Sequence, residues 1–461
     1  MTLTDDILNF QTDRVIARLD AGESANQIDI YGFTPLIEAA IANHLALATL
    51  LIERGADVRM KDLRGGTALH WAVENNNLPL AQLLLEKGAD PNAYPRSGQP
   101  ILVQPILRRQ QSIKELLYKY GADLKFAQDY ISAKLIGHRF ELMGRVDIVN
   151  HKNTFIEIDF EGFVLEFTLS TILDSIIQLK NNFAGRTLRP YFDDLEAVID
   201  AFVTACEFAR YQQYMANRHI DHYMHRLEKL AQSNLLLLPV GYEGHAITFV
   251  KCGHLFAKCD RGENSLSNPS VEIFYMPNTD LFNADFLKAF LYHRQNKYTV
   301  TTGIKQALNL TPIADIQLPS QLIGNCSWAN VEAAIPAIVL MRWLQDNLNP
   351  HKTDLSHHKK KALYIYKRWL AWDKDWALHH CVEDFYDASD ARKASRAAIL
   401  AAVLAQTCKH MRSTDMGRAN KILAVLETPA YRYVLDSYLK VYQGTEIAYN
   451  LKELMDLYGR H

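Results

Sequence analysis

The chain is poor in cysteine and in long apolar runs, and it has almost no net charge. Its six cysteines follow no framework spacing, which predicts free thiols in a reducing compartment. No run of 18 residues is free of charge, and residues 1–30 lack the apolar core of a signal peptide, so we expect neither a membrane span nor ordinary secretion. With 50 Lys and Arg against 52 Asp and Glu, a net charge of −2 gives no electrostatic reason to expect nucleic acid or an anionic membrane as a partner.

What the chain does have is a repeat in its first third. A leucine-rich segment that predicts a helix recurs every 33 residues, and each copy ends at one of the glycines Gly22, Gly55, Gly88 and Gly121. Residues 1–126 resemble about four ankyrin repeats, in which pairs of helices with a hairpin turn stack into a solenoid. Pro105 falls inside the first helix of the third unit and predicts a distorted helix pair there.

The repeats suggest three positions with a function. Ankyrin arrays bind proteins through their hairpin tips and concave face, and Glu38 and Trp71 occupy equivalent positions on that face. Trp71 is a candidate anchor for a partner protein, or it packs against the neighbouring repeat. Asn92 matches the position at which asparaginyl hydroxylases modify ankyrin hairpins, so the resemblance implies such an enzyme as a further partner. The alternative for Asn92 is a side chain that satisfies backbone groups of the turn.

Residues 127–350 mix strands and helices, which predicts an α+β domain. Residues 155–160 and 163–167 are expected to pair as a hairpin. A second hairpin is expected at residues 244–260 with its turn at Cys252-Gly253, which places His245 directly opposite Asp260. Such an aspartate can orient an imidazole, as in a catalytic triad, whereas a register slip of one residue would separate the two side chains. The alternative is an exposed ion pair across the hairpin.

Cys326 lies after a Gly-Asn turn, at the predicted start of an apolar helix that spans residues 331–347. The N–H groups of a helix N-terminus stabilise a thiolate and can hold an oxyanion beside it, and Gln321 could supply a second donor. Against this stands the fact that free cysteine most often simply packs.

Two clusters raise the question of metal binding. Three histidines repeat at intervals of three (His219, His222, His225), which is more typical of a solvated helix face than of a metal site. Cys252, His254 and Cys259 lack a fourth ligand and the paired spacing of zinc sites. We therefore expect neither a metal ion nor a cofactor.

The order His245, Asp260, Gln321, Cys326 resembles the cysteine peptidases of the adenain and ubiquitin-like-protease type, over about residues 235–345. The resemblance implies that Cys326 is the nucleophile, His245 the general base, Asp260 its orienting partner and Gln321 an oxyanion donor. Three features depart from that pattern: a Gln-to-Cys spacing one residue short, Ser327 in place of a glycine, and Ala246 in place of an aromatic residue.

Residues 351–461 are predicted to form a C-terminal helical domain. The expected fold is thus an α solenoid of ankyrin repeats, an α+β cysteine-protease-like domain and a C-terminal helical bundle. This combination resembles the ankyrin-repeat effectors that Legionella injects through its type IV secretion system. The resemblance implies a virulence role in the host cytosol, with a host protein bound by the repeats. The lysines at 359–361 could serve nuclear import or form a solvated helix start.

Two hypotheses of different classes follow. In the first, the protein is a hydrolase of the protease or deubiquitinase type, or an acyltransferase, and acts on a peptide or isopeptide bond through Cys326. In the second, the protease-like domain is catalytically inactive and the whole chain is a scaffold that perturbs a host complex by binding alone. The predicted register of His245 and Asp260 favours the first, and the short spacing before Cys326 favours the second.

Overall fold

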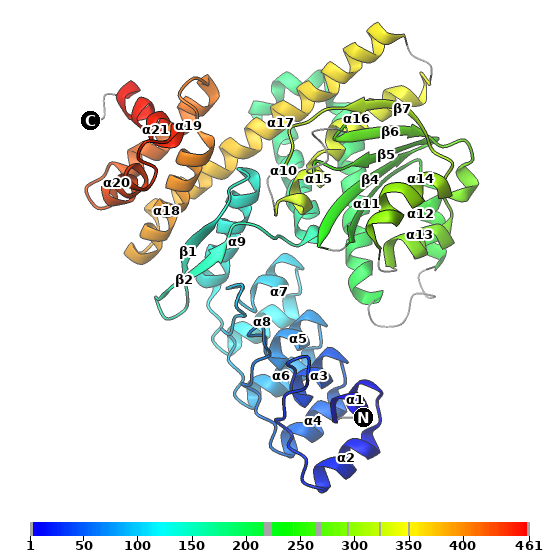
Figure 1. Ribbon diagram of the computed structural model, residues 1–461, viewed down its shortest axis with the longest axis vertical. Helices are drawn as coiled ribbons and strands as arrows, with labels where there is room; N and C mark the ends of the chain where they lie inside the picture. The colour runs from blue at the N-terminus through cyan, green and yellow to red at the C-terminus, as the bar shows by residue number, and fades with distance from the viewer. Residues whose placement is uncertain are drawn as a thin grey trace. The chain divides into compact units, whose positions relative to one another are not determined.

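A computed structural model describes residues 3–215, 224–242, 244–262, 269–292, 295–321, 324–348 and 351–458. Its contacts divide the chain into two compact units. The first consists of Met1–Leu135, Arg145–Asp159 and Asp387–Ile399, and the second of Ile136–Gly144, Phe160–Tyr386 and Leu400–His461. The predicted succession of ankyrin repeats, a sheet-containing region and C-terminal helices is confirmed (Figure 1).

Four pairs of short helices form the ankyrin array of the first unit (Figure 1). Helix starts are well defined because Thr34 accepts the N–H of Ile37 at 3.2 Å and Thr67 forms a capping box with His70. The expected distortion in the third pair is present: α7, which contains Pro105, has only five residues. The pairs are α1 Leu3–Leu8 and α2 Thr12–Asp20, α3 Pro35–Ile41 and α4 Leu45–Glu53, α5 Ala68–Glu74 and α6 Leu78–Glu86, and α7 Val103–Leu107 and α8 Gln111–Lys119.

A two-stranded hairpin follows the array, and here one expectation is wrong. Strand β2 (Phe155–Asp159) pairs with β1 (Arg145–Val149) on its N-terminal side, not with residues 163–167. The tight turn belongs to Asn150, whose Oδ1 accepts the N–H groups of Lys152 and Thr154. Residues 163–164 instead lead into helix α10 (Leu165–Asn181). The apolar residues at 163–167 therefore belong to the start of a helix. A run of five apolar residues is too short for its spacing to distinguish a helix from a strand.

The second unit is built on a five-stranded antiparallel sheet of order β3-β4-β5-β6-β7 (Figure 1). One face, with Ile247, Phe249 and Phe256, forms a core with residues of α12 and α13. On the other face α16 packs against β4, β5 and β6 while α15 packs against β4. The strands are β3 Leu235–Tyr242, β4 His245–Cys252, β5 Leu255–Cys259, β6 Val271–Tyr275 and β7 Thr311–Ile316.

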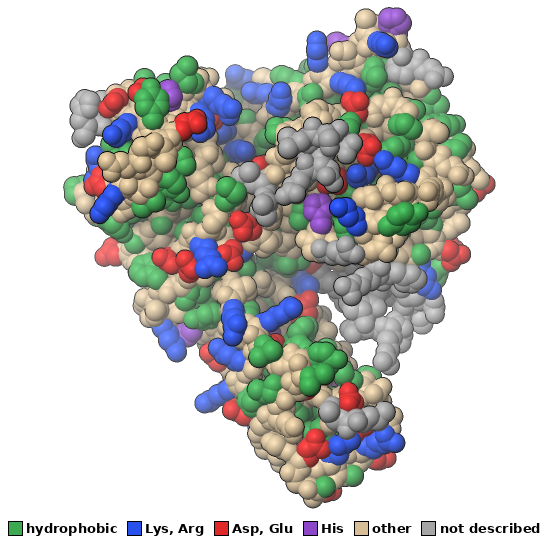
Figure 2. Space-filling model, viewed as in Figure 1, with side chains coloured by type: hydrophobic (Ala, Val, Ile, Leu, Met, Phe, Trp, Pro, Cys, Tyr) green, Lys and Arg blue, Asp and Glu red, His purple; other side chains and the backbone are tan. Residues whose placement is uncertain are grey.

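The remaining regular elements of the part of the chain that the structure describes are helices. Within the second unit α17, 35 residues long, packs against α16, α10 and α19. No helix among the described residues is long and apolar enough to cross a membrane. On the face shown in Figure 2, acidic and basic side chains are interspersed rather than gathered into one patch. The helices not yet given are α9 Leu124–Arg139, η1 Phe183–Tyr191, α11 Phe192–Met215, α12 Met224–Ala231, η4 Thr279–Leu281, α13 Ala284–Tyr292, η5 Thr299–Gly303, α14 Ile304–Ala307, α15 Cys326–Glu332, α16 Ala334–Gln345, α17 Lys352–Tyr386, α18 Asp390–Thr407, α19 Ser413–Leu426, α20 Arg432–Val441 and α21 Glu446–Leu457.

Candidate functional site

Cys326 is the first residue of helix α15, and the turn before it is held from two sides. Gly324 has a φ of +84°, and a Cβ there would lie 2.5 Å from the Cβ of Glu161, so this position needs glycine. The carbonyl of Gly324 accepts the N–H of Gly162 at 3.2 Å. Asn325 does not cap the helix with its side chain, which instead bonds the ring of buried His138. The thiol is therefore carried on a constrained turn and is half-buried.

The hairpin that carries His245 has a register two residues away from the expected one. The turn residues are Gly253 and His254, so Cys252 pairs with Leu255 and Thr248 with Cys259. Glycine fits the first turn position because its φ is +55°. The predicted direct opposition of His245 and Asp260 is thus wrong. Because a shift of two residues keeps every side chain on its face of the sheet, the two residues still share a face.

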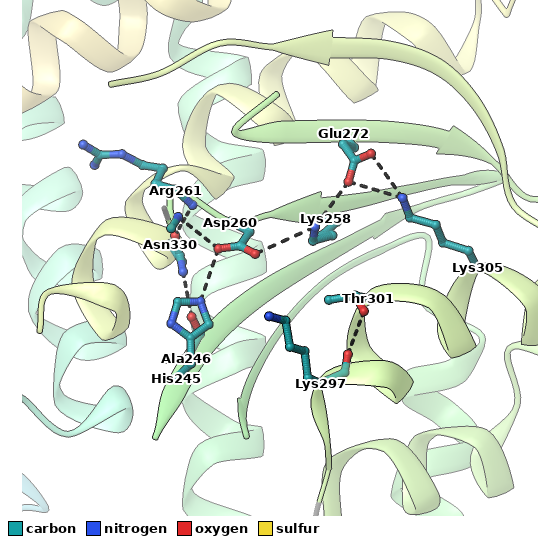
Figure 3. Close-up of polar contacts among 11 residues, drawn as sticks. His245, Ala246, Lys258, Asp260, Arg261, Glu272, Lys297, Thr301, Lys305 and Asn330 are labelled. Carbon is teal, nitrogen blue, oxygen red and sulfur yellow. Dashed lines mark hydrogen bonds and ion pairs between the residues drawn. The ribbon is translucent and has the colours of Figure 1, made fainter. Parts of the chain in front are cut away.

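The structure brings His245 and Asp260 into contact, as the dashed line between them in Figure 3 shows. Asp260 follows the last residue of β5, and its Oδ1 lies 3.2 Å from Nε2 of His245. The same Oδ1 accepts the N–H of Gly262 at 3.1 Å. Cys326 joins them: its Sγ accepts the N–H of Ala246 at 3.4 Å and interacts with the His245 side chain. Since Nε2 faces Asp260, the other ring nitrogen is the one available to the thiol.

The charges of the three groups support one another. Hydrogen bonds to Asp260 and then to Cys326 raise the pKa of His245 to about 9, against the opposing effect of burial. Burial raises the pKa of Cys326, but the interactions with His245 and the N–H of Ala246 outweigh it, so the net pKa is lowered. Burial likewise opposes ionisation of Asp260, yet the bond from His245 and the nearby Lys258 leave its pKa lowered. A thiolate beside an imidazolium is the state that this arrangement favours.

The other cysteines have different surroundings. All five are buried. Burial raises the pKa of Cys252 to about 11 and that of Cys408 to about 12, and it raises the pKa of Cys259 as well. The pKa of Cys326 is lowered instead, and its thiol is the one among the described cysteines that is not buried. Its thiol is thus distinguished by both exposure and charge.

A chain of charged side chains extends from Asp260 along the same face of the sheet (Figure 3). Lys258 Nζ lies 3.8 Å from Asp260 Oδ2 and 3.3 Å from Glu272 Oε2, and Lys305 Nζ lies 3.1 Å from Glu272 Oε1. The positive charge of Lys258 favours the ionised form of Asp260. Sequence reasoning missed Lys258, although its position two residues before Asp260 on a strand puts it on the same face.

The backbone of Gln321 is hydrogen-bonded to Arg261, the residue that follows Asp260. Its backbone N–H donates to the carbonyl of Arg261 at 2.8 Å. Among the residues that the structure describes, its buried Oε1 has no hydrogen-bond partner. The structure thus holds the Gln321 backbone beside the strand end, and no described contact joins its carboxamide to Cys326.

A buried ionic cluster supports the site, and sequence reasoning missed it entirely. Arg261, whose side chain is 4% exposed, pairs with buried Glu332 of α15 and lies 3.0 Å from Glu141. Tyr366 of α17 donates its hydroxyl to Glu332 at 2.7 Å. These residues come from segments far apart in the chain, so no local pattern could have revealed the cluster.

In the ankyrin array, the two predicted contact residues differ in exposure. Trp71 is partly exposed; its ring meets Phe33 of the preceding repeat edge-on at 6.4 Å and also lines a hollow of about 200 Å³ with Ile101 and Gln104. Trp71 therefore packs against the neighbouring repeat and also lines a hollow, so each of the two interpretations describes part of its surroundings. Glu38 is only 4% exposed, which contradicts its expected place on the binding surface. Burial, together with nearby Asp29, raises its pKa to about 7.

Asn92 connects two hairpins of the array. Its Nδ2 donates to the carbonyl of Gly121 at 2.8 Å and its Oδ1 accepts the N–H of Asp123 at 2.7 Å. Asn26 makes the same kind of bridge two intervals of the repeat earlier, to the carbonyl of Gly55 and the N–H of Asp57. These contacts are those expected of an asparagine that satisfies turn backbone, while hydroxylation of Asn92 stays a prediction.

The described residues contain no group of three side chains arranged to hold a metal ion. Of the three spaced histidines, His219 and His222 lie outside the described residues, and His225 is an exposed residue of α12. Two lysines of the 359–361 run form ion pairs, Lys359 with Asp315 and Lys361 with Asp194.

The first unit, with its stacked helix pairs, makes this an ankyrin-repeat protein, and the second adds a sheet domain with a Cys-His-Asp site at one strand end. A family model described as ankyrin repeats (3 copies) matches residues 9–95 and 55–127. The solved structure of the Legionella effector AnkH is similar at 44% identity and a TM-score of 0.83, over 100% of this chain and 98% of that chain. The chain belongs to the AnkH family. A comparison with curated proteins finds no match.

Proposed function

We propose that the protein is an effector of a host-directed bacterium, which binds a host protein through its ankyrin repeats and acts on a peptide or isopeptide bond with Cys326. The observation that carries the catalytic part is the position of His245, which contacts Asp260 at 3.2 Å while also interacting with the Cys326 thiol. The effector role rests on the similarity to AnkH. The type IV secretion route and host cytosol that the sequence suggested belong to the same proposal.

The chemistry would proceed through a thioester. The Cys326 thiolate attacks the carbonyl carbon, and the imidazolium of His245 gives its proton to the departing amine as the C–N bond breaks. Water, deprotonated by His245, then attacks the thioester carbonyl, which releases the carboxylic acid and restores the thiol. Asp260 holds the imidazole and stabilises its cation throughout. We assign the oxyanion to the N-terminal N–H groups of α15, with Gln321 as a second donor.

The proposal is tested with ubiquitin and ubiquitin-like vinyl sulfone probes and with iodoacetamide at neutral pH. Wild type and Cys326→Ala are compared, and peptide mass spectrometry follows each cysteine separately. We expect Cys326 to be alkylated first, because the other five cysteines are buried. If Cys326 reacts no faster than those five in the folded protein, the activated thiol does not exist. Covalent capture of one probe would also identify the substrate class.

Binding without catalysis is the second candidate, and the hollow beside Trp71 favours it. Its partly exposed ring and apolar neighbours suit a hydrophobic side chain of a partner, and aromatic residues in such hollows often dominate binding energy. The two candidates differ in what Cys326→Ala does. A scaffold keeps its cellular effect in that variant, whereas an enzyme keeps the partner but loses the effect.

A further inference from the structure

The pairing of β4 with β5 stops just before the candidate site. The register runs from Cys252↔Leu255 to Thr248↔Cys259 and goes no further. Continued by two residues, it would pair Ala246 with Arg261. In such a pair the N–H and C=O groups of Ala246 would bond directly to those of Arg261. In the structure these four groups have other partners.

All four groups are bound by residues from the segment that carries the nucleophile. The N–H of Ala246 donates to Cys326 Sγ at 3.4 Å, and the Ala246 carbonyl accepts Asn330 Nδ2 at 2.6 Å. The N–H of Arg261 donates to Asn330 Oδ1 at 2.6 Å, and the Arg261 carbonyl accepts the N–H of Gln321 at 2.8 Å. The carboxamide of Asn330 thus stands where a direct hydrogen bond between the strands would have been (Figure 3).

We propose that Asn330 is a positioning residue of the site: by bridging Ala246 and Arg261, it keeps the ends of β4 and β5 apart at the spacing that lets Cys326 accept the Ala246 N–H while His245 reaches Asp260. The inference rests on the proposed function of Cys326. Asn330 is completely buried and lies four residues after Cys326, hence on the same side of α15. One helix therefore carries both the thiol and the link that spaces its partners.

The chemistry of the bridge requires an amide. The carbonyl of Ala246 needs a donor and the N–H of Arg261 needs an acceptor, and a carboxamide supplies one of each. Asn330→Leu keeps the branched shape and the number of side-chain heavy atoms but supplies neither, so both backbone groups lose their partner. The strand ends are then free to draw together or to fray, and either change removes the N–H of Ala246 from the thiol.

The chain offers a matched control in Asn450. This asparagine is 3% exposed and also bridges two backbone groups, the carbonyl of Cys408 at 2.7 Å and the N–H of His410 at 2.9 Å. Asn450→Leu leaves the same kinds of group unpaired, but among helices α18, α19 and α21, away from β4. A general loss of stability should therefore appear in both variants, whereas a raised pKa of the Cys326 thiol should appear only in Asn330→Leu.

The experiment measures the pH dependence of iodoacetamide alkylation at Cys326 in the full-length protein, for wild type, Asn330→Leu and Asn450→Leu. We expect the wild-type midpoint to lie below the usual thiol value of about 8.5. Asn330→Leu should raise it toward that value, which lowers the rate at neutral pH about tenfold per pKa unit. Asn450→Leu should leave it unchanged. Protection of the five buried cysteines in the same spectra shows that each variant is folded.

Asn330→Ala serves as a second, less crowded variant if the leucine exposes those cysteines. A wild-type midpoint below the usual value that stays the same in the Asn330 variants would overturn the positioning role and leave the proposed function standing. A wild-type midpoint at or above the usual value would instead overturn the activated thiol itself. Equal shifts in the Asn330 and Asn450 variants would show a general loss of stability and would also refute the inference.

Discussion

Removal of the Arg261 guanidinium should destabilise the second unit strongly and in a pH-dependent way. Arg261 and Glu332 have side chains only 4% and 3% exposed, so Arg261→Met leaves the Glu332 carboxylate buried without its ion-pair partner, while the hydrogen bond from the Tyr366 hydroxyl stays in place. Breaking a buried ion pair from one side costs about 3–5 kcal/mol. At roughly 2–4 °C per kcal/mol for a unit of this size, the unfolding midpoint should fall on the order of 10 °C.

The sign of the pH dependence follows from Glu332. Burial raises the pKa of its carboxyl even with Arg261 present, and loss of the guanidinium raises it further. The folded variant then holds a proton that the unfolded chain releases above about pH 4.3. Stability is therefore least affected below that pH and falls as the pH rises toward the folded-state pKa of Glu332. Urea unfolding followed by circular dichroism from pH 4.5 to 8 measures this slope.

A double variant isolates the cause. Arg261→Met combined with Glu332→Gln removes the uncompensated charge and keeps an acceptor for Tyr366, so it should recover half or more of the loss at pH 7. Arg432→Met, which breaks an exposed pair with Asp436 in the same unit, should cost well under about 1 kcal/mol. A loss in Arg261→Met that is as small as in this control, or that does not change with pH, would refute the reasoning.

Four further outcomes are expected. Asp260→Asn removes the largest cause of the raised pKa of His245, about 9, so the alkylation midpoint of Cys326 should rise; an unchanged midpoint would show that the aspartate has no such role. Gly324→Ala places a Cβ in contact with Glu161 at a positive φ, and we expect a loss of about 1–2 kcal/mol in urea unfolding together with slower alkylation of Cys326. Trp71→Ala should lose a partner captured from host lysate while the unfolding midpoint changes little, and retention of every partner would remove the proposed anchor. Asn92→Ala breaks the bridge to Gly121 and Asp123 and should lower the stability of the array by about 1–2 kcal/mol, measured by thermal unfolding, whereas no loss would mean that water replaces the bridge.

His245 and Asp260 are in contact despite an error in the predicted strand register, because strand geometry tolerates a shift of two residues. The turn was placed one position early, so the register was wrong by two residues, yet His245 and Asp260 stayed on one face. An error of one residue would have separated them. The prediction that Glu38 is exposed was wrong for a different reason. The 33-residue period gives the position of Glu38 within its repeat, but its burial depends on how neighbouring repeats pack, which the period does not specify.

The sequence by itself determined the ankyrin array, because a 33-residue period repeats the same local contacts and each unit can only be buried by its neighbours. It also determined that a cysteine opens a helix and that a histidine and an aspartate share a sheet face. Only the tertiary structure decided that these residues meet. Where the β4–β5 ladder ends, four backbone groups need partners, and Cys326, Asn330 and Gln321 supply them from a segment 60 or more residues further along the chain. Such long-range bonds depend on how α15 packs on the sheet, which no local spacing in the chain specifies.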